Sequence, residues 1–118
     1  MKQQIVQLID PTGQVVATAQ VADEGGRFGG SIDLEATPPE MRALFVRFDE
    51  LVNGQVFSLL DEIEDRIAGL GLRARLEGGI ESSVEQLQIH PSTGDVSFRL
   101  GIPVAVNGIS KKNGRGTR

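Results

Sequence analysis

The stretch TPPEMRALFVRFDELVNGQVFSLLDEIEDRIAGLG, residues 37–71, decides which fold the sequence predicts. Its apolar residues recur at spacings of three and four, which is typical of one face of an α-helix that packs on a core. A capping-box pattern at residues 37–40 marks the start, with Thr37 as the N-cap and proline at the first helical position. Gly69 and Gly71 mark the end. The stretch therefore predicts one long central helix of about eight turns.

The dipeptide Asn53-Gly54 in the middle of this stretch would ordinarily indicate a turn. Gly54 lies opposite the apolar stripe, however, and the phase of the stripe is the same on both sides of it. We therefore predict a continuous helix, with a kink or a break into two shorter helices at Asn53-Gly54 as the alternative. The apolar stripe consists of Met41, Leu44, Phe45, Phe48, Leu51, Val52, Val56, Leu59, Leu60, Ile63, Ile67 and Leu70.

Stretches of alternating or β-branched residues flank the predicted helix and predict six strands. Three lie before it, at residues 5–9, 15–21 and 28–34, and three after it, at residues 72–76, 84–90 and 96–100. Residues rich in Asp, Pro and Gly connect them as turns, and Pro103 limits a further edge segment to residues 104–106. The predicted fold class is α+β in the order β-β-β-α-β-β-β, with two β-meanders joined in one antiparallel sheet and the helix packed on one face.

Length and charge indicate one domain with a basic end. A chain of 118 residues is expected to form a single core, which we place at residues 1–109. Residues 110–118 contain Lys111, Lys112, Arg115 and Arg118 without an acidic residue, and we predict a flexible basic C-terminal tail there. The preceding part has 8 basic against 16 acidic residues, so it repels phosphate backbones. Nucleic-acid binding is therefore expected only weakly, through the tail.

Several function classes are excluded or disfavoured by composition. The chain has no cysteine, which excludes disulfides, thiolate metal sites and cysteine nucleophiles. A single histidine, His90, excludes a site that needs two imidazoles from one chain. The N-terminus lacks the pattern of a secretory signal, and no apolar run is long enough to span a membrane, so we expect a cytoplasmic protein. No cofactor is predicted.

Four carboxylates lie close together in the second half of the predicted helix, and they form the best metal candidate. Asp61 shares a helix face with Glu64 or Asp65, and such oxygen ligands suit a hard cation. Calcium requires six to eight oxygens, however, and a helix face leaves its acids in water. We therefore interpret Asp61, Glu64 and Asp65 as a solvated surface and no more than weak metal candidates.

Two further motifs suggest chemistry but have structural interpretations. Residues 25–30, GGRFGG, look like a phosphate cradle, although such loops normally open onto a helix and a strand follows here. We interpret them as a turn and a glycine-rich strand against which something packs closely. His90 and Ser92 could form a base and a nucleophile, but the sequence around them supplies neither an orienting acid nor oxyanion donors. We interpret His90 as a turn residue.

Arg73 and Arg75 point the same way on a predicted strand, and with Arg99 they form a possible basic face. This face could bind an anion or an acidic partner. The alternative, which we prefer, is that the three arginines neutralise the acidic half of the helix.

Val46 and Phe57 fall on a flank of the helix, well away from the apolar stripe. A helix packed by one face would leave both in water, which indicates a second contact surface. A helix of about 33 residues would also extend beyond the width of a six-strand sheet. We therefore predict a homodimer whose interface includes Val46 and Phe57.

Three functional hypotheses follow from these observations. The first is a non-enzymatic protein–protein interaction or regulatory module that acts as a homodimer. The second is a metal- or anion-dependent binding protein or small enzyme that uses the acids at residues 61–65. The third is a nucleic-acid accessory factor that acts through the basic tail. The sequence contains no nucleophile, nucleotide-binding or zinc motif, which favours the first.

Overall fold

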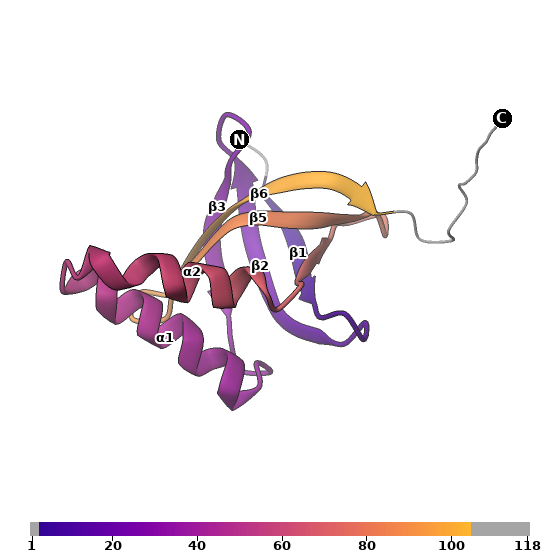
Figure 1. Ribbon diagram of the computed structural model, residues 1–118. Helices are drawn as coiled ribbons and strands as arrows, with labels where there is room; N and C mark the ends of the chain where they lie inside the picture. The colour runs from indigo at the N-terminus through magenta and orange to yellow at the C-terminus, as the bar shows by residue number, and fades with distance from the viewer. Residues whose placement is uncertain (1–2, 105–118) are drawn as a thin grey trace, which may run out of the picture.

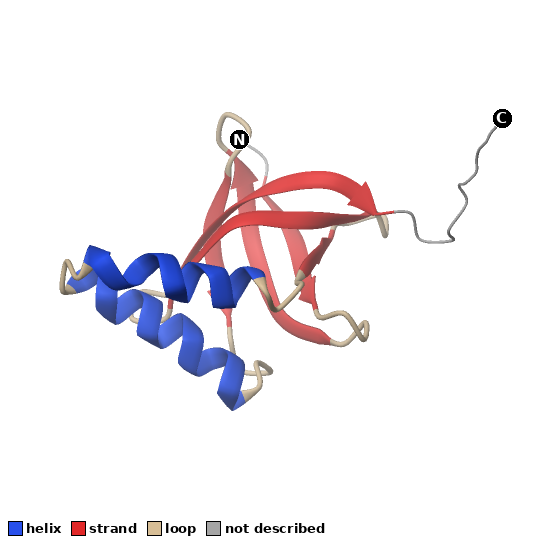
Figure 2. Ribbon diagram, in the orientation of Figure 1, coloured by secondary structure: helices blue, strands red, loops and turns tan. Residues whose placement is uncertain are grey.

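The computed structural model describes residues 3–104, and its strands form a closed antiparallel barrel with a pair of helices at one side (Figures 1 and 2). Three strands precede the helices, and three follow them. Their bounds are β1 Gln3–Ile9, β2 Val15–Asp23, β3 Phe28–Asp33, β4 Arg73–Arg75, β5 Glu81–His90 and β6 Asp95–Val104. The six predicted strands are therefore present, although β5 and β6 extend beyond the predicted bounds.

The predicted fold class, one antiparallel sheet with a helix packed on one face, is wrong, because the sheet closes into a barrel. The two meanders β1–β2–β3 and β4–β5–β6 do form, but β3 pairs with β6 and β4 pairs with β1, giving the closed order β1-β2-β3-β6-β5-β4. Closure removes both free sheet edges, which would otherwise expose unpaired backbone groups. It depends on the three-residue strand β4, whose partners lie at the end of β1, and on register shifts in β5 that bend this long strand.

The prediction of one long helix is also wrong, and the break lies at the dipeptide that was noted as the alternative. Helix α1 covers Pro39–Asn53, a 3₁₀ turn η1 covers Phe57–Leu59, and helix α2 covers Leu60–Ala68. The two helices lie side by side and run in opposite directions (Figure 1). We call this unit the helical hairpin.

A Schellman motif ends α1, which is the physical reason for the break. Gln55 adopts a left-handed conformation with φ of 58°. Its N–H donates to the Val52 carbonyl at 3.1 Å, and the Val56 N–H donates to the Leu51 carbonyl at 2.9 Å. The left-handed position of this motif is usually a glycine, but here it is Gln55. The glycine, Gly54, stands one position earlier and has a right-handed φ of −85°. The apolar residues recur at spacings of three and four both before and after Gly54, but this pattern is equally compatible with two separate helices.

The start of α1 differs from the predicted capping box. Pro38 is the N-cap, and no side chain caps the helix. Thr37 is buried, and its hydroxyl donates a hydrogen bond of 2.6 Å to the carbonyl oxygen of Val16 on β2. The threonine therefore anchors the entry of the hairpin to the barrel.

The part of the apolar stripe that lies within α1 and α2 forms the inner face of the helical hairpin, whereas Val56 and Leu59, which the stripe also included, are exposed between the helices. Phe45, Phe48 and Leu51 from α1 join Ile63 and Ile67 from α2 in a single buried core with the barrel. The barrel contributes apolar side chains from its strands, including Val6, Leu8, Val16, Val21, Ala74, Ile89, Val96 and Phe98. No helix in the described part of the chain is long and apolar enough to cross a membrane.

Candidate functional site

A buried carboxylate joins the helical hairpin to the barrel. Asp49 of α1 is 4% exposed and reaches the turn between β5 and β6. Its Oδ2 accepts hydrogen bonds from the backbone N–H of Ser92 at 3.0 Å and from the Ser92 hydroxyl at 2.6 Å. Its Oδ1 lies 3.0 Å from Nδ1 of His90 and accepts a bond from Asn53 at 3.2 Å. We call these four residues the Asp49 cluster.

The ionised form of Asp49 is stabilised in this cluster. Burial raises the pKa of Asp49, but the hydrogen bonds from Ser92 and His90 outweigh burial and hold the pKa below its ordinary value of 3.8. The carboxylate therefore stays charged at neutral pH, and its two oxygen atoms accept the hydrogen bonds that the surrounding groups donate.

The Asp49 cluster supplies the orienting acid that the sequence around His90 and Ser92 did not show. The order of contacts nevertheless differs from a hydrolase triad, because the Ser92 hydroxyl donates to Asp49 rather than to His90. A serine held in this way is not activated as a nucleophile. The arrangement connects α1 to the β5–β6 turn, and the ring of Phe48 packs against the imidazole with centroids 5.6 Å apart.

Sequence reasoning missed Asp49, although a signal was present. Residues 45, 49 and 52 lie on one face of α1, so Asp49 interrupts the apolar face of the helix. A charged residue at such a position is buried and therefore needs partners.

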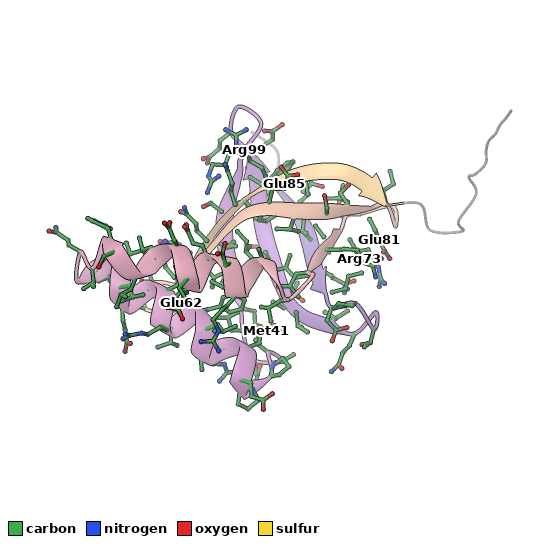
Figure 3. All side chains as sticks on the ribbon, in the orientation of Figure 1. Met41, Glu62, Arg73, Glu81, Glu85 and Arg99 are labelled. Atoms are coloured by element: carbon green, nitrogen blue, oxygen red, sulfur yellow. The ribbon has the colours of Figure 1, made fainter. Side chains whose placement is uncertain are left out.

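The predicted basic face is divided between two places. Arg73 and Arg75 do lie together on β4, where both bind Glu81 of β5 at 3.5 Å and 3.3 Å. Both arginines therefore pair with Glu81, whose single charge balances one of them, and neither forms an ion pair with an acid of the two described helices. Arg99 lies elsewhere on the barrel, near Glu85 (Figure 3).

Arg99 meets a residue that the sequence did not associate with it. The Oε1 atom of Gln86 accepts hydrogen bonds from Arg27 Nη1 at 3.2 Å and from Arg99 Nε at 3.1 Å. Arg27 Nη2 also donates to the Gln86 carbonyl at 3.3 Å and to the Ser97 hydroxyl at 2.9 Å. We call Arg27 and Arg99 the arginine pair.

The glycine-rich residues 25–30 form the turn between β2 and β3 and the start of β3, as interpreted from the sequence. Gly25 and Gly26 have φ of 74° and 92°, which favour glycine. At Gly30 a side chain would overlap the carbonyl oxygen of Gln20, so β2 passes too close for any other residue.

The acidic residues of α2 border a groove between α2 and β5. Glu64 and Asp65 line it together with Glu85, and apolar side chains such as Ile67 and Leu87 complete a volume of about 520 Å³. Asp61 is not among the lining residues. Within residues 3–104, no three His, Cys, Asp or Glu side chains form a group that could hold a metal ion. The weak metal candidates therefore gain no geometric support.

The predicted interface residues are both exposed. Val46 on α1 is 37% exposed, and Phe57 in η1 is 61% exposed. Val56 and Leu59 are exposed beside Phe57, at 40% and 41%. We call Val56, Phe57 and Leu59 the hairpin tip, because they lie where the chain turns from α1 to α2 (Figure 1). The predicted tail at residues 110–118 and the domain boundary before it lie outside the described residues.

The comparisons with known proteins give no further assignment. The chain matches no protein-family model, and neither the curated proteins nor the solved structures include a significant match to it.

Proposed function

We propose that this chain is a protein-interaction module that forms a homodimer through the hairpin tip. The observation that carries the proposal is the exposure of Phe57. The other four phenylalanines are buried or half-buried, whereas 61% of Phe57 is in contact with water. Burying a phenylalanine side chain contributes roughly 1.5–3 kcal/mol, so an exposed one at a turn favours association.

A second copy of the chain is the partner that fits this surface best. In a two-fold dimer the same patch lies on both sides of the interface, so one apolar tip covers another. Val46 lies on the outer surface of α1 and would extend the contact along the hairpin. The length of the helix no longer supports a dimer, because the break folds α1 and α2 onto one barrel. The proposal therefore depends on exposure alone.

The charges near the tip predict how salt affects the dimer. The acids Asp61, Glu62, Glu64 and Asp65 follow the tip directly on α2. In a two-fold dimer they approach their copies, and this repulsion is screened by salt. Association through the tip should therefore become tighter as the salt concentration rises, whereas binding that depends on opposite charges would become weaker.

Light scattering after size exclusion tests the proposal. The expected mass is about twice the 12.7 kDa of the chain. Phe57→Asp should reduce it to the mass of one chain, because a carboxylate in the interface is not solvated. The matched control is Ile80→Asp, because Ile80 is 57% exposed and lies outside the helices. A monomer at high protein concentration, or a dimer that survives Phe57→Asp, contradicts the proposal.

A further inference from the structure

The arginine pair places two positive side chains next to one acceptor. Arg27 Nη1 and Arg99 Nε both lie within 3.2 Å of the Oε1 atom of Gln86. Arg27 directly precedes β3, and Arg99 lies on β6. The two side chains therefore come together only when β3 pairs with β6 to close the barrel. Like charges at this separation repel each other, and an amide oxygen is neutral. Gln86 therefore bonds both guanidinium groups without balancing their charge, and an anion at this exposed position would be attracted to both.

No carboxylate of residues 3–104 forms an ion pair with Arg27 or Arg99. This contrasts with Arg73 and Arg75, which share Glu81. Three acids that neighbour the pair in the chain or in the strand register make other contacts. Asp23 accepts the backbone N–H of Gly26 at 2.8 Å, and the carboxyl of Glu24 lies against Gly29. Glu85 is opposite Arg99 in the strand register, but its carboxyl lies against Gly101.

Gln86 is held in an unusual backbone conformation at this point. Its φ is 54°, and it lies where the register between β5 and β6 shifts. A left-handed conformation is costly for a residue other than glycine, and at Gln86 it belongs to the bulge in β5. Here it directs both the side-chain oxygen and the main-chain oxygen of Gln86 towards the arginines. The bulge therefore fixes the orientation of Arg27, which also binds Ser97.

Donors for a ligand remain on Arg99. Its Nε is bonded to Gln86, but within the described part of the chain neither Nη1 nor Nη2 donates a hydrogen bond. Arg99 is exposed, and Gly26 lies beside its Nη1 atom, since a Cβ built at Gly26 would be 3.7 Å from it. A guanidinium presents its N–H groups in a planar fork that matches two oxygens of a phosphate.

We propose that the arginine pair, with Gly26 beside it, is a binding site for a single phosphate group carried by a small molecule. A phosphate has two or more oxygens for the fork of Arg99, and its charge balances both guanidinium groups. A long polyanion does not fit, because the part of the chain before residue 110 has 16 acidic against 8 basic residues. The site is separate from the hairpin tip, so this inference does not depend on the proposed dimer.

Titration of the isotope-labelled full chain with inorganic phosphate, followed by NMR at neutral pH and constant ionic strength, tests the site. Saturable shifts are expected at the guanidinium N–H groups of Arg27 and Arg99 and at the backbone of Gly25 and Gly26. Sodium chloride and sodium acetate at the same ionic strength are the reference titrations. Shifts of the same size with acetate or chloride overturn the proposal, as does the absence of saturable shifts with phosphate.

Variants show whether the arginines bind the phosphate. Arg99→Gln should weaken phosphate binding at least about tenfold, because it removes charge-assisted hydrogen bonds. Arg47→Gln is the matched control, since it removes the same charge from an exposed position on α1 and should leave phosphate binding unchanged. Arg99→Lys keeps the charge without the fork and should bind with intermediate affinity. Equal phosphate binding by the wild type and Arg99→Gln, with both chains folded, contradicts the proposal.

Discussion

Removal of the Asp49 carboxylate should destabilise the fold more than removal of any exposed acid. Asp49 is 4% exposed and accepts four hydrogen bonds, two of them from Ser92. Hydrogen bonds to a charged group contribute about 1.5–3 kcal/mol each, but these contributions do not add fully. Ser92 is exposed, and the His90 side chain is 27% exposed, so both recover bonds to water when Asp49 is absent.

We therefore expect Asp49→Ala to lower the free energy of unfolding by about 2–4 kcal/mol, slightly below the range for breaking a fully buried pair. The melting temperature should fall by roughly 10 °C. Urea denaturation measures the change, with an unaltered m-value as evidence that the same two states are compared. Asp65→Ala, at an exposed position on α2, is the matched control and should change stability by no more than about 0.5 kcal/mol.

The pH dependence of this difference has a defined sign. The pKa of Asp49 is lowered in the folded chain relative to 3.8, so its contribution is complete above that value. As the pH falls from about 4 towards the lowered pKa, the unfolded state takes up the proton first and the contribution is lost. The difference in unfolding free energy between the wild type and Asp49→Asn should therefore become smaller below pH 4.

The comparison at pH 7 tests the role of the buried carboxylate itself. If Asp49→Ala and Asp65→Ala are equally stable at pH 7, the hydrogen bonds of Asp49 do not stabilise the fold.

Two further substitutions test how the barrel is assembled. Gly30→Ala should destabilise the fold by about 3 kcal/mol or more, because the new Cβ overlaps the carbonyl oxygen of Gln20 and β2 and β3 must separate. Circular dichroism during heating measures this change, and a melting temperature equal to that of the wild type would show that the two strands are not in such close contact. Thr37→Val removes the donor to the buried Val16 carbonyl at nearly constant volume, and it should lower the unfolding free energy by about 1–3 kcal/mol in urea denaturation. No change in the urea midpoint would show that water replaces the lost bond.

Local sequence patterns were sufficient for most of the elements. The alternation of apolar residues and the turn residues at residues 10–13 and 91–95 located the strands and both hairpins, because these signals depend on neighbours along the chain. The spacing of the apolar stripe also identified the buried face of both helices. Helix continuity could not be read in the same way. Each helix has its own apolar face with a spacing of three and four, so this periodicity does not show that the chain reverses at Gln55 between the two helices.

The candidate sites depend on contacts that are distant in the sequence. Asp49 and Ser92 are 43 residues apart, and Arg27 and Gln86 are 59 apart. No local pattern relates such residues. The sequence grouped Arg99 with Arg73 and Arg75 as one basic face, whereas Arg99 lies on β6 and the other two on β4, with β5 between them. Their actual partners are set by the strand register and by the bulge at Gln86. The exposure of Val46, in contrast, could be read from the helical wheel, because Val46 lies within α1. Phe57 is exposed as predicted, but it lies beyond the break, and Val56 and Leu59, which the same wheel placed in the apolar stripe, are exposed beside it.

Residues within a few positions of one another specify the strands, their connecting turns and the apolar face of the helices, so these features could be predicted without the structure. The joining of the two meanders into a barrel depends on contacts between distant parts of the chain. Closure requires β4 to pair with β1, which lies more than sixty residues away in the sequence. This pairing satisfies backbone groups that two free sheet edges would otherwise expose. The same closure brings Arg27 and Arg99 to one glutamine.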